Sequence, residues 1–126
     1  MARRPIATDS APGAIGTYSQ AIEADGTLYL SGQIPLDPVS MELVTDDIQK
    51  EIQRVFDNLS AVAQAAGANL NDAVKLTVYL VDLGDFGAVN EVMATYFGEP
   101  YPARAAVQVA ALPKGARVEV DAILRP

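Results

Sequence analysis

Apolar residues recur at spacings of three and four in two stretches of the chain, as they do in amphipathic helices. The first stretch begins near Ile48 and ends before Gly67, and we expect Thr45 to cap its N-terminus. Its apolar positions are expected to pack in the core and are Ile48, Ile52, Val55, Phe56, Leu59, Val62, Ala63 and Ala66. The second helix is expected over about residues 85–97, before Gly98 and Pro100. It should bury Phe86, Val89, Met93, Tyr96 and Phe97.

Alternating apolar and polar residues predict the strands. Residues 17–24 and 27–34 flank Asp25-Gly26, a pair typical of the two-residue type I′ hairpin turn. Residues 73–81 predict a third strand. The residues expected on its apolar face are Val74, Leu76, Val78 and Leu80.

Residues 101–121 also alternate, around the turn sequence Leu112-Pro113-Lys114-Gly115. We interpret them as a second hairpin, in which Gln108 lies opposite Glu119. One face of this hairpin should be apolar. The other should carry Arg104, Gln108, Arg117, Glu119 and Asp121.

Pairing across the first hairpin predicts that Tyr18 lies opposite Gln33 and that Gln20 lies opposite Ser31. Uncharged hydroxyl and amide groups would then gather on one side of the sheet. Two interpretations remain open at this point. The group is either an ordinary polar face of the sheet or a set of hydrogen-bonding groups that line a pocket.

The expected element order is ββαβαββ, which indicates an α+β fold with both helices on one face of a single sheet. The first ten residues are expected to form an arm or an edge strand. Tyr79 and Val81 should lie on the uncovered face of the sheet, and the chain has no further layer to cover them. We therefore expect self-association through this face.

Composition limits the chemistry that the chain can perform. Its 126 residues, half of them hydrophobic, predict a single globular domain over residues 1–126. The absence of Cys and His leaves no disulfide, no thiolate nucleophile, no serine-histidine triad and no usual transition-metal ligands. Acid–base chemistry must therefore come from Asp, Glu, Tyr or Lys, and we expect no metal and no cofactor.

Charge and hydropathy narrow the partners and the compartment. The net charge of -7 works against nucleic-acid binding, because affinity for phosphates depends on clustered Lys and Arg. Residues 5–16, which follow Arg3 and Arg4, lack the apolar run of an export signal, and no later run is long enough to span a membrane. We expect a cytoplasmic protein that does not bind membranes.

Five short segments, in order along the chain, carry a resemblance to a known family. They begin at Gly16, Ser31, Ala66, Tyr101 and Leu112, and read GTYSQA, SGQIP, AG, YPAR and LPKG with the following VEV. The chain resembles the RidA/YjgF family from about Thr8 to its end. This resemblance implies a chorismate-mutase-like fold and a homotrimer with three ligand clefts between neighbouring subunits. It also implies hydrolysis of reactive enamines and imines, such as 2-aminoacrylate and 2-iminobutanoate, to 2-oxo acids and ammonia.

The resemblance also implies the site residues. Arg104 matches the arginine that anchors the substrate carboxylate, and a guanidinium can grip a carboxylate through two parallel hydrogen bonds. Glu119 matches the acid that holds and activates water. The implied substrate-binding positions are Tyr18, Ser31, Gly32, Asn90 and the main chain of Ala106. The chain departs from the family pattern at Thr17, where most members have Pro, and at Ala106, where many have Cys.

Two other functions remain open from the residues. The same clefts could serve a non-enzymatic sensor of small carboxylates or a chaperone-like protein. The family has also been described as endoribonucleases and translation inhibitors, which fits less well with an acidic chain that lacks His.

Overall fold

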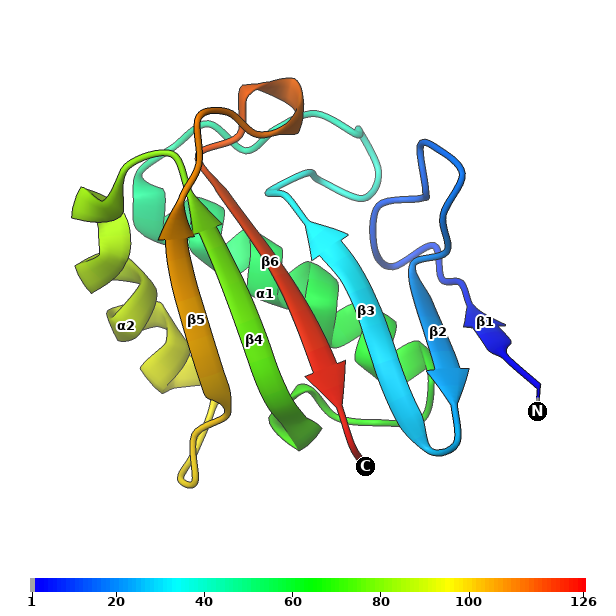
Figure 1. The fold of residues 1–126 in the computed structure, drawn as a ribbon. Coiled ribbons are helices and arrows are strands. Elements are labelled where there is room, and N and C mark those ends of the chain that lie inside the picture. Colours follow the sequence, from blue (N-terminus) through cyan, green and yellow to red (C-terminus); the bar gives the residue numbers. More distant parts are fainter. Residues whose placement is uncertain (1) are drawn as a thin grey trace.

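The computed structural model describes residues 2–126, which form a mixed six-stranded sheet with two helices on one face (Figure 1). The helices are α1 (Ile48–Ala65) and α2 (Phe86–Tyr96). In spatial order the strands are β1 (Arg4–Ile6), β2 (Ala21–Ala24), β3 (Thr27–Gln33), β6 (Val118–Leu124), β4 (Ala73–Leu80) and β5 (Ala103–Gln108). The expected α+β fold is confirmed, and β1 adds an edge strand to the expected order.

The core lies between the sheet and the two helices. The predicted stripe of α1 is confirmed from Ile52 to Ala63, and the helix packs on the buried rows of β3 and β6. Phe56 joins α1 to the end of α2, because its ring centroid lies 5.4 Å from that of Tyr96 and 5.7 Å from that of Phe97. Full burial of each such side chain contributes roughly 1.5–3 kcal/mol to stability.

Two details of the predicted helix and strand are wrong. Asp47, not Thr45, caps α1, and its side-chain Oδ1 accepts a hydrogen bond of 2.9 Å from the amide of Lys50. Val74 is exposed rather than buried, because the pairing register between β4 and β6 shifts between Ala73 and Lys75. A register irregularity of this kind turns one side chain to the other face.

The first hairpin is confirmed. Asp25 and Gly26 both have positive φ, as a type I′ turn requires, and join Ala24 directly to Thr27. The predicted pair of Gln20 with Ser31 is present as a backbone hydrogen bond of 3.0 Å. The predicted pair of Tyr18 with Gln33 is wrong, because β2 begins at Ala21, opposite Leu30, and Tyr18 lies outside its pairing with β3.

The second hairpin is wrong. β5 pairs with β4 in parallel, and β6 runs antiparallel to β4 on its other side, so that β4 separates the two predicted partners. A helix between two strands favours this parallel β4–α2–β5 unit. Gln108 therefore lies opposite Leu80, and Glu119 lies opposite Tyr79.

This topology separates residues that were expected to share a face. Paired residues in a sheet point to the same side. Arg104 pairs with the buried Leu76 and therefore points to the helix-covered side, whereas Glu119 pairs with Tyr79 on the open side. The prediction that Arg104 and Glu119 lie on one face is wrong.

The helices formed by residues 2–126 include none that combines the length and the apolar character needed to cross a membrane.

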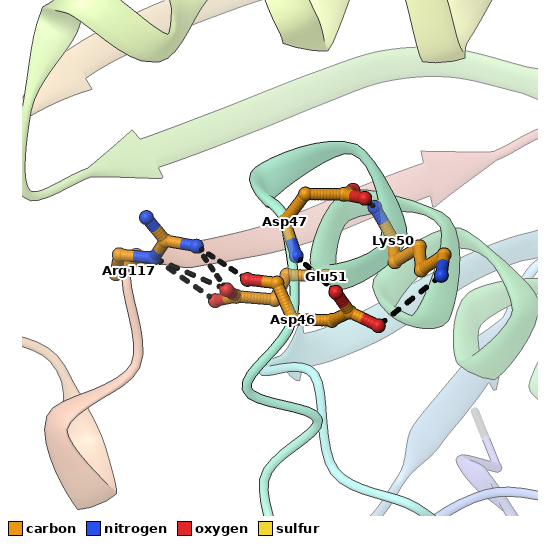
Figure 2. Close-up of polar contacts among 5 residues, drawn as sticks. All are labelled: Asp46, Asp47, Lys50, Glu51 and Arg117. Carbon is orange, nitrogen blue, oxygen red and sulfur yellow. Dashed lines mark hydrogen bonds and ion pairs between the residues drawn. The ribbon is translucent and has the colours of Figure 1, made fainter.

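A buried carboxylate ties the first turn of α1 to the start of β6. Glu51 is only 4% exposed and accepts hydrogen bonds from Arg117 Nε and Nη2 (Figure 2). Arg117 Nη2 also donates to the carbonyl of Asp46 at 3.0 Å. Figure 2 also shows the neighbouring pair of Lys50 with Asp46, which is exposed to solvent.

We expect Arg117→Ala to lower the free energy of unfolding by about 1.5–3 kcal/mol, because it leaves the buried Glu51 carboxylate without its charged partner. Chemical denaturation measures this loss. Lys50→Ala is the matched control and should leave the denaturation midpoint nearly unchanged. Adding Glu51→Ala to Arg117→Ala should recover part of the loss, and strictly additive effects would contradict a coupled pair.

Candidate functional site

A cavity of about 360 Å³ opens on the uncovered side of the sheet, beside the ends of β3 and β6. Its polar lining comes from four of the predicted site residues, namely Tyr18, Ser31, Gly32 and Glu119, and from Gln33. The rest of its lining is largely apolar and comprises Pro12, Gly13, Ile15, Ile34, Leu36 and Pro113. Glu119 carries the one carboxyl group among these lining residues, so the cavity combines a single acid with an apolar wall.

Glu119 lies directly against the backbone of β3 at Gly32. A Cβ atom placed on Gly32 would overlap Glu119 Oε2 and lie 2.9 Å from its Cδ. Only glycine at this position leaves room for the carboxylate where it now lies. The glycine of the segment SGQ therefore contributes to the site by leaving space for the Glu119 side chain.

Burial raises the pKa of Glu119 above its ordinary value, and the nearby carboxylate of Asp121 adds to this effect. Asp121 lies two residues further along β6 on the same face, and its Oδ2 accepts a hydrogen bond of 3.0 Å from Tyr79 Oη. The Glu119 carboxyl is therefore suited to exchanging a proton under milder conditions than a solvated glutamate.

The two predicted hydroxyl groups at the cavity are held in different ways. Ser31 Oγ donates a hydrogen bond of 2.6 Å to the carbonyl of Ser19. Tyr18 is half exposed, and its Oη accepts a long hydrogen bond of 3.4 Å from the amide of Ile15. Tyr18 is therefore the freer of the two to meet a ligand.

Gln20 does not line this cavity, in contrast to the pocket interpretation of the first hairpin. Its side chain is buried, and its Nε2 donates to the carbonyls of Thr8 and Pro12 at 3.1 and 2.8 Å. Its Oε1 accepts from the amide of Thr8 at 2.7 Å. Gln20 therefore holds the loop that carries Pro12 into the cavity wall.

Arg104 lies at a second hollow, of about 430 Å³, between the edge strand β5 and α2. Its Nη1 donates to Asn90 Oδ1 at 2.6 Å and contacts Met93 Sδ at 3.3 Å. Its guanidinium carbon lies 4.7 Å from the centroid of the Phe86 ring. These contacts orient the guanidinium while part of its hydrogen-bonding edge stays available.

The residues around Arg104 share one face of α2. Phe86, Asn90 and Met93 are spaced by four and three, so one helical stripe supplies the stacking ring, the amide and the thioether. Asn90 was predicted, whereas Phe86 and Met93 were predicted only as core residues. Tyr101 also lines this hollow. Ala106 lies two residues after Arg104 on the same side of β5, outside the lining of the hollow.

The predicted site residues thus fall into two groups within the described chain. Tyr18, Ser31, Gly32 and Glu119 lie at the open-face cavity, and Arg104 and Asn90 lie at the hollow beside α2. Glu119 on β6 lies two strand spacings, about 10 Å, from Arg104 on β5, and the thickness of the sheet also lies between them. Within residues 2–126, no three Asp or Glu side chains come together in a way that could hold a metal ion.

A sequence profile of the family described as Endoribonuclease L-PSP, which is the RidA/YjgF family, matches residues 8–125 of the chain. The chain belongs to this family. A mouse relative named 2-iminobutanoate/2-iminopropanoate deaminase is 52% identical over 121 residues, covering 96% of this chain and 90% of the mouse protein. The resemblance identified from the five sequence segments is therefore confirmed.

Solved structures of RidA/YjgF proteins superpose closely on this one. RidA from the Antarctic bacterium Psychrobacter sp. PAMC 21119 is 52% identical, with a TM-score of 0.94 over 98% of this chain and 99% of that one. TdcF from E. coli, solved with bound serine, is 40% identical, with a TM-score of 0.92 over 98% of both chains. The family fold therefore extends over nearly the whole chain.

We expect Gly32→Ala to displace the Glu119 carboxylate from the cavity, because the new methyl group would occupy its present position. A crystal structure of the variant would show Glu119 in another rotamer. Gly98→Ala is the matched control, since a Cβ there meets nothing within 4 Å. If Glu119 kept its position in Gly32→Ala, the close approach of its carboxylate to the backbone at residue 32 would be contradicted.

Proposed function

We propose that the protein hydrolyses small 2-imino acids, such as 2-iminobutanoate and 2-iminopropanoate, to 2-oxo acids and ammonia. This proposal depends on one observation about the sheet. Arg104, a cation suited to binding a carboxylate, and Glu119, an acid suited to activating water, lie on opposite faces of it. We propose that two copies of the chain bring these faces together in a cleft, within a homotrimer.

The comparisons support a small ligand with a carboxylate. The mouse relative is named for two imino acids, and the E. coli relative was solved with serine, an amino acid of similar size. Both imino acids and serine carry a carboxylate beside a carbon that bears nitrogen. Arg104 offers the guanidinium fork that such a carboxylate requires.

The uncovered face of the sheet supports the proposed assembly. Tyr29 and Val107 are 50% and 42% exposed there, and Val81 is also exposed at the end of β4. Apolar side chains spread over a sheet face are typical of surfaces that a partner covers. A partner on this face would also narrow the cavity in which Glu119 lies.

In the proposed reaction, Arg104 of one copy binds the substrate carboxylate and Glu119 of its neighbour holds a water molecule. The ionised Glu119 accepts a proton from this water as its oxygen bonds to the imine carbon. Glu119 passes this proton to the imine nitrogen, and the added hydroxyl group then gives up its own proton to the nitrogen, again through Glu119, as the carbon–oxygen double bond forms and ammonia leaves. The water and the C=NH group thus become C=O and NH3. Such positioned acid–base assistance is worth roughly 10²–10⁴ in rate.

Burial of the cleft by the second copy would strengthen each of these interactions. A lower effective dielectric strengthens the attraction between the guanidinium and the substrate carboxylate. It also strengthens the interaction of ionised Glu119 with the water from which it takes a proton. The proposed roles of Tyr18 and Ser31 are to hydrogen-bond the substrate or the water. Gly32 allows Glu119 to reach that water.

The family description also mentions an endoribonuclease. The chain contains no His and carries a net charge of -7, so it lacks the usual general base and a phosphate-binding surface. We favour the imine because the site offers one cation and one acid.

Mixing two inactive variants tests the shared cleft. Arg104→Lys and Glu119→Gln should each lose nearly all acceleration of 2-oxobutanoate release when a threonine dehydratase supplies the imine. Mixed trimers contain intact clefts formed by Arg104 of one chain and Glu119 of another. Random 1:1 assembly should therefore restore about a quarter of the wild-type activity.

Two controls complete this experiment. Each variant alone should keep the oligomeric state of the wild type in sedimentation, so that the loss reflects the cleft. Mixed assemblies that remain inactive would overturn the shared cleft. A wild-type protein that binds 2-oxobutanoate without accelerating its release would indicate a binding protein instead of an enzyme.

The raised pKa of Glu119 sets the acid limb of the pH profile. Since ionised Glu119 accepts the proton, kcat/KM should fall as the pH falls through this pKa, above the ordinary value of 4.5. Asp121→Asn removes the carboxylate repulsion and should move the limb to lower pH. Glu23→Gln removes a carboxylate paired with Arg4 and should leave the limb in place. An unshifted limb in Asp121→Asn would contradict the assignment to Glu119.

A further inference from the structure

The apolar wall of the Glu119 cavity belongs to a small cluster separate from the main core. Ile34, Leu36 and Ala116 form this cluster, with Met41 and Leu43 packed against them. The segment that carries Ile34 and Leu36 follows β3 and pairs with the main sheet no further. Its position relative to the cavity therefore depends on a few contacts outside the sheet.

Asn58 of α1 supplies two of these contacts. Its side chain is fully buried, and its Nδ2 donates to the carbonyl of Leu36 at 3.0 Å and to that of Ile34 at 3.4 Å. Its Oδ1 accepts from Arg54 Nε at 3.1 Å, which fixes the orientation of the amide. Every polar atom of the Asn58 side chain is thus paired, and its amide grips the backbone directly behind the two wall residues.

The geometry of the substrate directs its third substituent to this wall. The trigonal imine carbon bears nitrogen, the carboxylate and the side chain. If Arg104 of the neighbour holds the carboxylate and Glu119 faces the carbon and nitrogen, the side chain is left with the remaining lining. That lining includes Pro12, Ile34, Leu36 and Pro113 and carries no further charge.

We propose that Asn58 is the positioning residue of this wall: by holding Ile34 and Leu36 at the cavity, it sets how well the site accepts a longer apolar side chain of the substrate. This inference rests on the proposed imine hydrolysis. It adds the residue that shapes the site for the side chain of the substrate. One methylene in a well-shaped apolar pocket discriminates about tenfold or more, provided that the pocket holds its shape. Asn58 provides that shape by holding the wall from the helix side.

Asn58→Asp is the informative variant, because it keeps the size of the side chain and the acceptor for Arg54 but removes both donors. Two buried carbonyls would then face a carboxyl oxygen, and the wall would move away from the cavity. Asn58→Ala removes the same donors without adding charge. The control is Arg125→Ala, which removes a comparable clamp on Asp25 and Thr27 at the turn of the first hairpin.

The measurement is the ratio of kcat/KM for 2-imino-4-methylpentanoate to that for 2-iminopropanoate, both generated in place by an amino-acid oxidase. Both substrates use the same Arg104 and Glu119, and the ratio is independent of how much of the variant is folded. Either Asn58 variant should lower the ratio about fivefold to tenfold, mainly through KM of the longer substrate. Arg125→Ala should leave it unchanged. A ratio within twofold of the wild type, or a higher one, in both Asn58 variants would overturn the inference.

Binding of the corresponding 2-oxo acids separates this inference from the proposed reaction. Calorimetry gives the ratio of the Kd values for 2-oxo-4-methylpentanoate and 2-oxopropanoate without any turnover. A preference for the longer acid that Asn58→Asp removes would support the role of Asn58 even in a protein without deaminase activity. A wild-type protein with deaminase activity but no preference between the two acids would overturn the role of Asn58 alone.

Discussion

The pleat of the sheet is the constraint on which this site depends. Neighbouring residues in paired strands must point to the same side, so the register of β4 with its two neighbours decides where every polar group lies. Through that register, Arg104 follows Leu76 toward the helices and Glu119 follows Tyr79 away from them. No rotamer of either side chain can bring them together around one small molecule within one chain. The proposed chemistry therefore makes association a condition of activity.

Local signals in the sequence predict much of the fold. The stripe of α1 and the Asp25-Gly26 turn depend on neighbouring residues, and both are found as expected. The second hairpin is wrong for a physical reason. Alternation in residues 101–121 indicates two strands but does not identify their partners, and β4 pairs along both of its edges, with β5 on one side and β6 on the other. The competing βαβ connection determines the topology.

For the site, too, the sequence predicts what depends on neighbouring residues and not what depends on strand pairing. The types of its residues were predicted from the family resemblance, but their division between two faces depends on pairing that no short motif records. Phe86 and Met93 share the helical stripe of Asn90, and this spacing is visible in the sequence. Asn58 is similarly visible as an amide beside the apolar stripe of α1. Its proposed role depends on the place of Ile34 and Leu36 in the cavity wall, which the sequence does not record.

The contact of Glu119 with the bare backbone at Gly32 also has a consequence for how such a protein can evolve. A side chain at position 32 displaces the acid at position 119 from its present rotamer, so the two positions are coupled although they are distant along the chain. A lineage that has lost the acid can fill position 32 without this conflict. Restoring the acid afterwards would return the carboxylate to the chain but not to its present place in the cavity.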